Sequence, residues 1–333
     1  MKFSFVIAAY NVEEYIEKCI QSILDCMTPN YEIEIIVIND GSTDDTSKII
    51  ERLVVEHSNV KLITQNNQGL SATRNNGLKE VTGEYVFFVD GDDQLANIAN
   101  PKDFFDYVLK NHTDAVVFPA DCVCAGKCSH FFVPPTMSDT ISGVQALTYL
   151  LEEDYSFGWV VWHYAFRTAF LKDNNFVFPE GRISEDVYYT LRFLLKAESI
   201  GFYKQEAIYL YRRDNVSSIS TCAKFKLVDD LTYIMENNLP VIATINDDKL
   251  KTLLYLNYQT LVIVILSHYA YYDIEQRKEL KKRLNKMRII YQTNTKYSYL
   301  YHKRESIVKL MLKLFGVDIT GKLWKIKKKI VGH

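Results

Sequence analysis

Residues 84–93 read Glu-Tyr-Val-Phe-Phe-Val-Asp-Gly-Asp-Asp, and this stretch decides the fold. Its apolar part, residues 85–89, is typical of a buried β-strand. The strand ends in Asp90, Asp92 and Asp93, with Gly91 at the bend. Open α/β sheets bind their ligands outside the carboxyl ends of the strands. We therefore expect an α/β fold in which these three carboxylates lie at the carboxyl edge of the sheet.

Carboxylates gathered at one point repel each other, and two interpretations account for them here. A hard divalent cation, Mg²⁺ or Mn²⁺, neutralises such a cluster and usually also binds phosphate oxygens of a substrate. The alternative is an acidic β-turn, because Asp-Gly is common in turns. The residues of this stretch alone leave both interpretations open.

The composition bounds the size and the class of the protein. A chain of 333 residues suffices for one large domain or two, and 48% of hydrophobic residues can fill a sizeable core. The net charge of −2 gives no indication of a nucleic-acid partner. The chain begins with a strand-like run and no signal-peptide pattern, which predicts a cytoplasmic protein. Residues 252–272 are apolar but include Asn257, Gln259 and His268, which favours a buried helix over a membrane span.

The cysteines Cys122, Cys124 and Cys128 form a C-x-C-x3-C cluster near His130. Such a cluster invites a zinc interpretation, but no second pair at zinc-ribbon spacing follows it. We favour reduced thiols, as expected of a cytosolic protein.

Strand-like and helix-like runs alternate through the first 120 residues. Single helices between strands imply a mainly parallel sheet with right-handed crossovers. Residues 126–142 have no clear period, and we expect a loop there. The expected strands are 3–9, 33–38, 60–64, 85–89 and 115–119, and the expected helices are 12–24, 45–57 and 70–79.

Helical patterns dominate from about residue 224 onward, at 224–237, 247–272, 274–287 and 305–315. We therefore divide the chain into an α/β domain, residues 1–222, and a helical region, residues 223–333. The tail from Gly321 to His333 holds five lysines among apolar residues that include Trp324. On a helix this pattern gives the apolar and cationic faces of an interfacial anchor, and Trp324 favours contact with an anionic membrane surface over a solvated tail.

Four segments would converge at the carboxyl edge of a parallel sheet: residues 8–11, 39–44, 67–75 and 90–93. Gly41 and Gly69 would allow close backbone approach, Arg74 could meet a phosphate, and the carboxylates could meet ribose hydroxyls or a metal. Taken singly, each piece is as well explained by a turn, a helix cap or a surface charge. Together, at successive strand ends, they indicate a nucleotide site.

The order AAYN, NDGSTDDT, GLSATRNNGL and GEYVFFVDGDD, over about residues 1–95, resembles the family-2 glycosyltransferases of the GT-A fold. Weaker matches follow at residues 178–181, 184–186, 211–213 and 217–220. The first position of NDG is often Asp in the family and is Asn39 here. The C-terminal third matches no family pattern.

The resemblance implies a UDP-sugar donor and roles for individual residues. Tyr10 would stack on uracil, Asp40 would accept its N3–H, and Asp92 would bind Mn²⁺ or Mg²⁺ at the diphosphate. The implied nucleotide-sugar-binding residues are Ala9, Tyr10, Asn11, Asp40, Gly69, Arg74, Asp90, Gly91, Arg212 and Arg213, and the implied metal ligands are Asp92 and Asp90.

An acceptor hydroxyl needs a base as it attacks. Asp186, with Glu185 beside it, begins a helical run and is the candidate base. The alternative is that both acids only favour the helix dipole in a first turn. Trp162, His163 and Asp93 are the candidate acceptor-binding residues.

The leading hypothesis is an inverting, metal-dependent hexosyl- or N-acetylhexosaminyltransferase. It would act on a glycan or lipid-linked acceptor in surface polysaccharide synthesis, in the cytoplasm or on the inner face of the plasma membrane. The alternative is a non-catalytic sugar-nucleotide-binding scaffold of the same fold. An NAD-binding oxidoreductase is disfavoured, because no G-x-G-x-x-G follows a strand.

Overall fold

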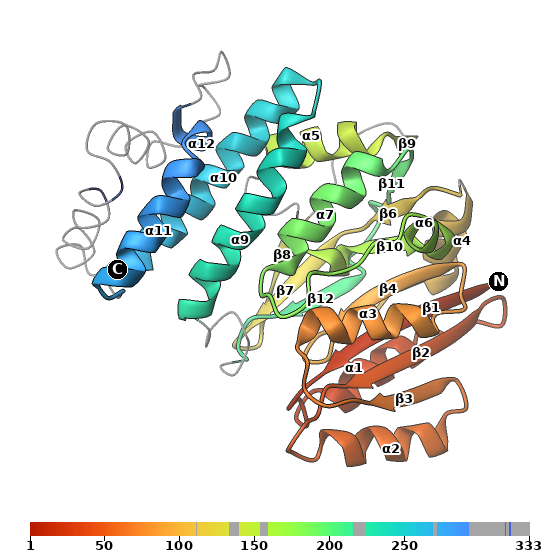
Figure 1. The fold of residues 1–333 in the computed structure, drawn as a ribbon. Coiled ribbons are helices and arrows are strands. Elements are labelled where there is room, and N and C mark those ends of the chain that lie inside the picture. The colour runs from red at the N-terminus through yellow and green to blue at the C-terminus, as the bar shows by residue number, and fades with distance from the viewer. Residues whose placement is uncertain are drawn as a thin grey trace. The chain divides into compact units, whose positions relative to one another are not determined.

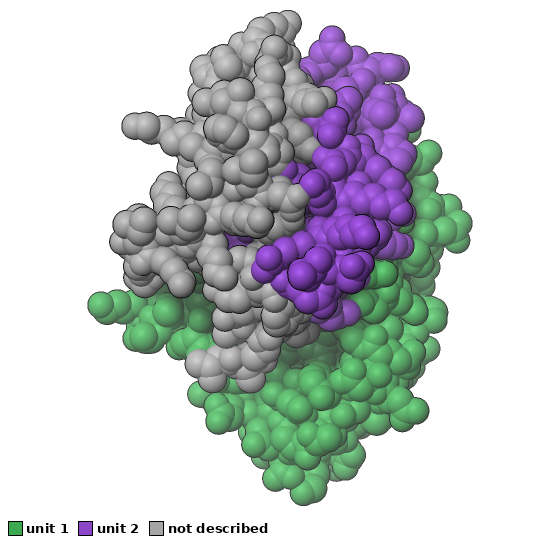
Figure 2. Space-filling view, turned by 60° about the vertical axis from the view of Figure 1, so that its left-hand side comes forward, with its two compact units in different colours: residues 1–146, 159–217 green, residues 147–158, 218–333 purple. Residues whose placement is uncertain are grey.

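The computed structural model of the protein describes residues 1–110, 112–132, 140–153, 159–215, 224–268 and 272–292, with the single residues Val317 and Thr320. The chain divides into two compact units (Figure 2). The first consists of residues 1–146 and 159–217, and the second of residues 147–158 and 218–333. All predicted donor, metal, base and acceptor residues belong to the first unit. The predicted domain division at residue 222 lies outside the described residues and stays a prediction.

Four parallel strands carry the predicted motifs. β1 (Lys2–Ala9) lies between β2 (Glu32–Asn39) and β4 (Tyr85–Asp90), and β3 (Val60–Thr64) pairs with β2 (Figure 1). The register pairs Ala9 with Asn39 and Ala8 with Asp90, so β1, β2 and β4 end level with one another. The predicted strands 3–9, 33–38, 60–64 and 85–89 are therefore confirmed.

Beyond β4 the sheet becomes mixed. β10 (Tyr164–Arg167) runs antiparallel to both β4 and β6 (Ala115–Val117), β11 (Ile200–Phe202) is parallel to β6, and β9 (Thr140–Ile141) is antiparallel to β11. The order of the eight strands is β3-β2-β1-β4-β10-β6-β11-β9. The later strands have only two to four residues, too few to show a period, so the sequence did not reveal the antiparallel pairs.

Helices connect the strands and cover the sheet. α3 packs on β1 and β2, and Gly77 of α3 allows the close contact, because a Cβ there would lie 2.2 Å from Cγ1 of Val6. The helices of this unit are α1 (Ile16–Leu24), α2 (Thr46–Glu56), α3 (Leu70–Glu80), α4 (Pro101–Lys110), α6 (Thr168–Asp173) and α7 (Glu185–Lys196), and α5 (Gly143–Glu153) is divided between the two units.

A second sheet has the strand order β5-β12-β7-β8, formed by β5 (Gln94–Leu95), β12 (Tyr209–Arg212), β7 (Ala120–Cys124) and β8 (Lys127–Phe132). The expected loop at 126–142 is therefore wrong at 127–132 and, because β9 lies there, at 140–141, whereas residues 133–139 are not described. Ala125 and Gly126 have φ values of 50° and 74°, as a two-residue hairpin turn requires. The four exposed side chains at the start of β8 hide this edge strand from a hydrophobic pattern.

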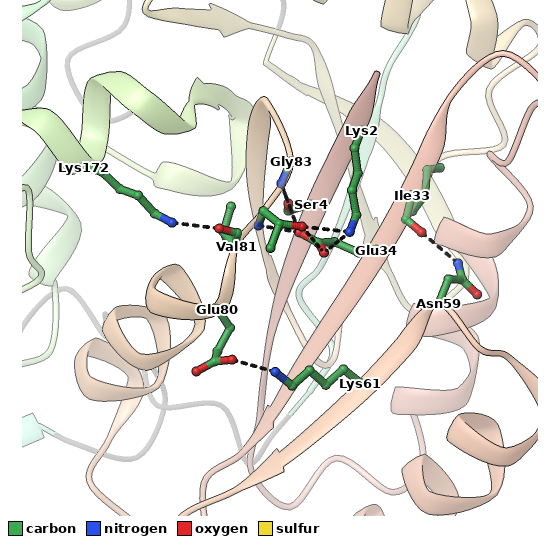
Figure 3. Close-up of polar contacts among 11 residues, drawn as sticks. Lys2, Ser4, Ile33, Glu34, Asn59, Lys61, Glu80, Val81, Gly83 and Lys172 are labelled. Atoms are coloured by element: carbon green, nitrogen blue, oxygen red, sulfur yellow. Dashed lines mark hydrogen bonds and ion pairs between the residues drawn. The ribbon is translucent and has the colours of Figure 1, made fainter.

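At the amino-terminal edge of the parallel strands, the carboxylate of Glu34 joins β1, β2 and the turn before β4 (Figure 3). It pairs with Lys2 Nζ at 2.6 Å and accepts hydrogen bonds from the Ser4 hydroxyl, from the Thr82 N–H and hydroxyl at 2.7 Å each, and from the Gly83 N–H at 3.1 Å. Burial by itself would raise the pKa of Glu34, but these donors outweigh it and lower the pKa to about 2. The ionised carboxylate therefore holds the three strands in register.

The second unit is helical. α10 (Asp248–His268) packs against α9 (Lys224–Ala243) and α12 (Ile289–Gln292), and Arg283 of α11 (Ile274–Lys286) pairs with Asp229 and Glu236 of α9 at 2.6 and 2.9 Å. The predicted helices at 224–237 and 274–287 are confirmed, and the helix predicted at 247–272 is confirmed as far as His268, where the described residues are interrupted. The predicted helix 305–315 and the basic tail 321–333 lie outside the described residues.

Within the described part of the chain, α10 is the one helix long and apolar enough to cross a membrane by length and composition. In the structure, 67% of its apolar window is buried, as in the core helix of a folded unit. Asn257 and Gln259 are buried on this helix, and the Gln259 side-chain amide donates to the carbonyl oxygen of Ile290 at 2.5 Å.

Candidate active site at the carboxyl edge of the sheet

Gly91 brings the acidic loop against β1. Its N–H donates to the carbonyl oxygen of Ala8 at 2.9 Å, and a Cβ at this position would lie only 2.8 Å from that oxygen. A side chain would therefore push the loop away from β1. Because β4 ends beside β1, Asp90 and Asp92 lie at the same edge of the sheet as Tyr10.

The segment after β1 presents an aromatic ring. Tyr10 is 47% exposed, although it follows the buried Ala9 at the end of β1. Asn11 has a left-handed backbone, with φ at 50°, and its side-chain oxygen accepts from the Thr43 N–H at 2.8 Å. Its own N–H donates to the Ser42 hydroxyl at 3.0 Å. These bonds tie the loops after β1 and β2 together and leave the Tyr10 ring open for stacking on a planar ligand.

Asp40, which follows β2, shapes the loop before α3. It is 3% exposed, its Oδ1 accepts from the Gln65 amide at 2.7 Å and the Gln68 N–H at 2.8 Å, and its Oδ2 accepts from the Gly69 N–H at 2.8 Å. Gly69 has φ at 87°, which glycine adopts readily. Asp40 thus has a structural role that its motif did not indicate, and its predicted bond to uracil stays a prediction.

The guanidinium of Arg74, on α3, lies at the centre of the site and is 1% exposed. Its Nη1 donates to Glu185 Oε1 at 2.6 Å and to Asp186 Oδ1 at 3.0 Å, and its Nη2 donates to Asp90 Oδ1 at 2.8 Å. The start of α7 is thereby joined to the end of β4. Arg74 thus contacts three carboxylates in this structure, and its predicted contact with the nucleotide stays a prediction.

Negative charge exceeds positive charge around Arg74. Burial raises the pKa of Asp186 well above its usual range, Arg74 opposes the rise, and Glu185 and Asp90 add to it. Burial also raises the pKa of Glu185 against the effect of Arg74. The Asp186 side chain is 16% exposed and that of Glu185 only 5%. A raised pKa and an accessible oxygen are what a general base near neutral pH requires, which favours Asp186.

Asp92 and Asp93 have different surroundings. Asp92 Oδ2 accepts from the Asn215 amide at 2.7 Å, and burial and the nearby Asp90 raise the pKa of Asp92. Asp93 is 1% exposed and accepts from the Tyr209 hydroxyl and the Arg212 N–H at 2.7 Å each. Burial, followed by Asp92 and Asp90, raises the pKa of Asp93 well above its usual range. Asp93 therefore anchors β12 to the acidic loop, and both of its oxygens are engaged where acceptor contact was expected.

The two arginines after Tyr211 differ. The Arg212 Nε donates to the carbonyl oxygen of Asp92 at 3.1 Å, and its guanidinium lies 5.0 Å from the centre of the Tyr15 ring. Arg213 is exposed, and its N–H donates to the carbonyl oxygen of Val123 in the second sheet. Arg212 is thus the one of the pair that contacts the acidic loop.

Trp162 and His163 lie in an aromatic core. The Trp162 ring stacks on Tyr209 with centroids 4.5 Å apart, and His163 packs between Phe132 and Tyr164 at 4.9 and 4.3 Å. Burial lowers the pKa of His163 to about 3. With exposures of 4% and 0%, these two predicted acceptor residues support the wall of the site instead of facing solvent.

The donor chemistry of the acidic loop fits a divalent cation that arrives with a phosphate. Burial and the nearby Asp90 raise the pKa of Asp92, and the Asn215 amide and Arg212 offset this rise only in part. Among the residues that the structure describes, no three His, Cys, Asp or Glu side chains are arranged to hold a metal by themselves, and this includes Cys122, Cys124 and Cys128. Mg²⁺ typically binds one or two carboxylates and completes its shell with water and substrate phosphates. Asp92, with Asp90 beside it, matches this pattern.

Three residues that the sequence analysis did not single out complete the site: Asn75, Tyr209 and Asn215. The Asn75 side chain pairs with both backbone groups of Phe178, at 3.0 and 2.8 Å. Its signal in the sequence was a polar residue on the buried side of a helix, next to Arg74. Tyr209 and Asn215 contact the acidic loop from more than a hundred residues away, and no spacing rule would find them.

Comparison with known proteins finds a family match for the first part of the chain. Residues 4–127 match the family model described as glycosyl transferase family 2. The chain is 32% identical over 223 residues to the uncharacterized glycosyltransferase EpsJ of Bacillus subtilis, covering 65% of this chain and 62% of EpsJ. It is 30% identical over 211 residues to the poly(ribitol-phosphate) beta-N-acetylglucosaminyltransferase TarS of Staphylococcus aureus, covering 63% of this chain and 35% of TarS. The chain thus spans less than two thirds of the length of either relative.

Solved structures share the fold. The crystal structure of TarS residues 1–349 with UDP-GlcNAc matches with a TM-score of 0.71 and 21% identity, over 99% of this chain and 92% of that one. The mannosyltransferase PcManGT of Pyrobaculum calidifontis, solved with GDP-Man and Mn²⁺, matches with a TM-score of 0.52 and 14% identity, over 96% and 86%. The predicted resemblance is confirmed to this extent: residues 4–127 match the model of glycosyl transferase family 2, and the chain shares the GT-A fold of TarS.

Proposed function

We propose that the protein is an inverting, metal-dependent glycosyltransferase that moves a sugar from a UDP-sugar to a hydroxyl of a glycan or lipid-linked acceptor. The observation that carries the proposal is the junction at Arg74. It holds Asp90, at the end of the strand that leads into the acidic loop, and Asp186, at the start of α7, on one guanidinium. A donor-binding edge and a candidate base therefore meet at one place, as a displacement at the anomeric carbon requires.

In the proposed reaction, the oxygen of the acceptor hydroxyl forms a bond to the anomeric carbon, and Asp186 takes the hydroxyl proton. The bond between the anomeric carbon and the diphosphate oxygen breaks, and UDP leaves with the electron pair. Asp186 suits the base because burial raises its pKa and so makes the carboxylate a stronger proton acceptor. Tyr10 would stack on the uracil, and Arg212, which contacts the acidic loop, would face the diphosphate.

A divalent cation bound with the donor would stabilise the charge that builds on the leaving diphosphate. Asp92 is the proposed ligand and Asp90 the second carboxylate. PcManGT, a structural neighbour, is solved with Mn²⁺, which supports Mn²⁺ or Mg²⁺ as the first ions to test.

The relatives support a choice of donor and acceptor. TarS is solved with UDP-GlcNAc, so UDP-N-acetylhexosamines are the first donors to test, followed by UDP-hexoses. The name of TarS describes transfer to a polyol phosphate polymer, which supports a hydroxyl of a cell-surface polymer as acceptor. We place the enzyme in the cytoplasm, at the inner face of the plasma membrane, where such polymers and their lipid-linked precursors are assembled.

A panel of UDP-sugars with the full chain tests the function. Release of UDP should require Mn²⁺ or Mg²⁺, stop in EDTA, and rise when a suitable acceptor is added. Calorimetry should find tighter binding of UDP than of CDP, because a carboxylate accepts the uracil N3–H but faces an acceptor nitrogen in cytosine. Tight UDP binding without any turnover would instead favour the non-catalytic scaffold. Equal activity with and without EDTA would contradict the proposed dependence on a metal.

A further inference from the structure

We propose that Arg74 is a positioning residue that fixes the candidate base Asp186 relative to Asp90, and that it does not bind the nucleotide. This inference rests on the proposed function. It departs from the role that the sequence motif implies, and it follows from where the guanidinium lies.

The contacts of Arg74 leave no face for a phosphate. The side chain is 2% exposed, and both terminal nitrogens donate to carboxylates at 2.6 to 3.0 Å. Nη1 donates twice and Nη2 once, and Nε is buried without a hydrogen-bond partner. The three carboxylates therefore set the orientation of the group, even at the cost of one unmade hydrogen bond. The Phe178 ring lies beside the guanidinium, 5.4 Å away, and closes another side.

The neighbouring residue Asn75 also binds the segment that leads to Asp186, residues 178–186. It pairs with both the N–H and the carbonyl of Phe178, while Arg74 binds Glu185 and Asp186. Consecutive residues of α3 thus hold both ends of residues 178–186. Between these ends, Gly181 and Ser184 have left-handed backbones, with φ at 71° and 58°. This segment leads into α7, and α3 binds it at both of its ends.

The planar fork of Arg74 sets the geometry of the reaction. One guanidinium spans Asp90 and Asp186, which fixes the position of the base relative to the edge that would hold the donor. Arg74 binds Oδ1 of Asp186 and so fixes the orientation of that carboxylate. A lysine offers a single point charge and cannot hold both carboxylates in this way.

The test compares Arg74→Lys and Arg74→Gln with a matched control, Arg167→Gln. Arg167 also pairs with a mostly buried carboxylate of the first unit, that of Asp114, but it lies on β10 outside the proposed site. For each variant, calorimetry gives the Kd of UDP, steady-state kinetics give kcat and KM for the donor, and hydrogen exchange reports on residues 178–186. Arg74→Lys keeps the buried positive charge and so remains informative if Arg74→Gln fails to fold.

We expect both Arg74 variants to lose kcat at least 100-fold, to keep the Kd of UDP within about threefold, and to exchange faster at residues 178–186. We expect Arg167→Gln to keep its kcat and the exchange of that segment. In an Asp186→Asn background, Arg74→Lys should cost little more, because the group it positions is already disabled.

A tenfold or larger rise in the Kd of UDP with unchanged kcat would overturn the inference and restore Arg74 to the nucleotide. Equal losses from Arg74→Lys in the wild-type and Asp186→Asn backgrounds would also overturn it. The failure of the proposed function would be recognised differently, as a wild-type protein without turnover on any UDP-sugar.

Discussion

Five acidic residues lie close together at the carboxyl edge of the sheet, and their hydrogen-bond partners give them different roles. Asp90 and Glu185 are bound by Arg74, and Asp93 is fully used in holding β12. Asp92 and Asp186 combine a raised pKa with partial compensation of their charge. The predictions about the general base and the metal ligand therefore concern these two residues.

Replacing Asp186 by asparagine keeps its size and removes its basicity. We expect turnover to fall by about 10² to 10⁴-fold, the range typical of a general base, while UDP affinity is retained. Glu185→Gln should cost less, because its side chain is 5% exposed and turned to Arg74. Turnover and UDP affinity measured for both variants decide between them. An inactive Glu185→Gln beside an active Asp186→Asn would show that the two roles are exchanged.

Replacing Asp92 by asparagine should separate activity from stability. We expect loss of the metal-dependent UDP release, because a ligand of the cation is removed. In EDTA the variant should melt at or above the temperature of the wild type, since a raised pKa means that the ionised Asp92 opposes folding at pH 7. Asp93→Asn is the contrasting variant and should melt lower, because Tyr209 and Arg212 lose their acceptor. An active Asp92→Asn enzyme would refute the metal role.

How far the site could be predicted depends on where its residues come from. The motifs at the ends of β1, β2 and β4 predicted Tyr10, Asp90 and Asp92 at one edge, because parallel strands end together. The contact between Arg74 and Glu185 could not be predicted, since the two residues lie 111 positions apart and no local pattern connects them. For the same reason, the interpretation of Arg74 as a phosphate ligand did not predict its contacts with the carboxylates of α7.

At the scale of elements, the sequence predicted the long helices and strands with a clear hydrophobic period. It did not predict short elements or those whose bounds differ from their hydrophobic pattern. α1 begins at Ile16 and not at residue 12, because residues 13–15 form a turn before it. The Val12 N–H is bound by the Thr46 hydroxyl at 2.9 Å and the Glu13 N–H by Asp44 at 3.1 Å. β8 was missed because an exposed edge strand lacks an apolar alternation.

The Glu34 junction gives an element-level test of acid stability. Glu34→Gln should lower the free energy of unfolding at pH 7 by about 2 kcal/mol, because the charged acceptor of several donors is lost. The pKa of Glu34 is lowered on folding, so the wild-type advantage should be full above about pH 4.5 and disappear as the pH falls towards about 2. Denaturant unfolding across this range measures it.

Glu80→Gln is the matched control for that experiment. Its partner Lys61 lies 2.6 Å away, but the two side chains are 40% and 56% exposed (Figure 3). An exposed pair contributes little, so this change should alter the free energy of unfolding by less than about 0.5 kcal/mol. Equal effects of Glu34→Gln and Glu80→Gln at pH 7 would contradict the role given to Glu34.

At the scale of the whole molecule, the basic tail is the feature that would place the enzyme at its acceptor. Deleting residues 321–333 should leave activity on a soluble acceptor nearly unchanged and weaken sedimentation with anionic vesicles. Binding of the full chain should also fall as salt rises, because screening weakens attraction to a charged surface. Equal sedimentation of both proteins, at low and high salt, would rule out the tail as an anchor.

Because carboxylates crowd the edge of the sheet, the melting temperature of the protein should respond to the binding of its substrate. A ligand that binds only the folded state stabilises it by about 2.7 kcal/mol at a hundred times its Kd. Burial, followed by repulsion from the neighbouring carboxylates, raises the pKa of Asp92 and of Asp93, and a bound cation would relieve that repulsion. Cation and correct nucleotide should therefore raise the melting temperature more together than the sum of their separate effects. Thermal scanning can rank donors in this way before any acceptor is known.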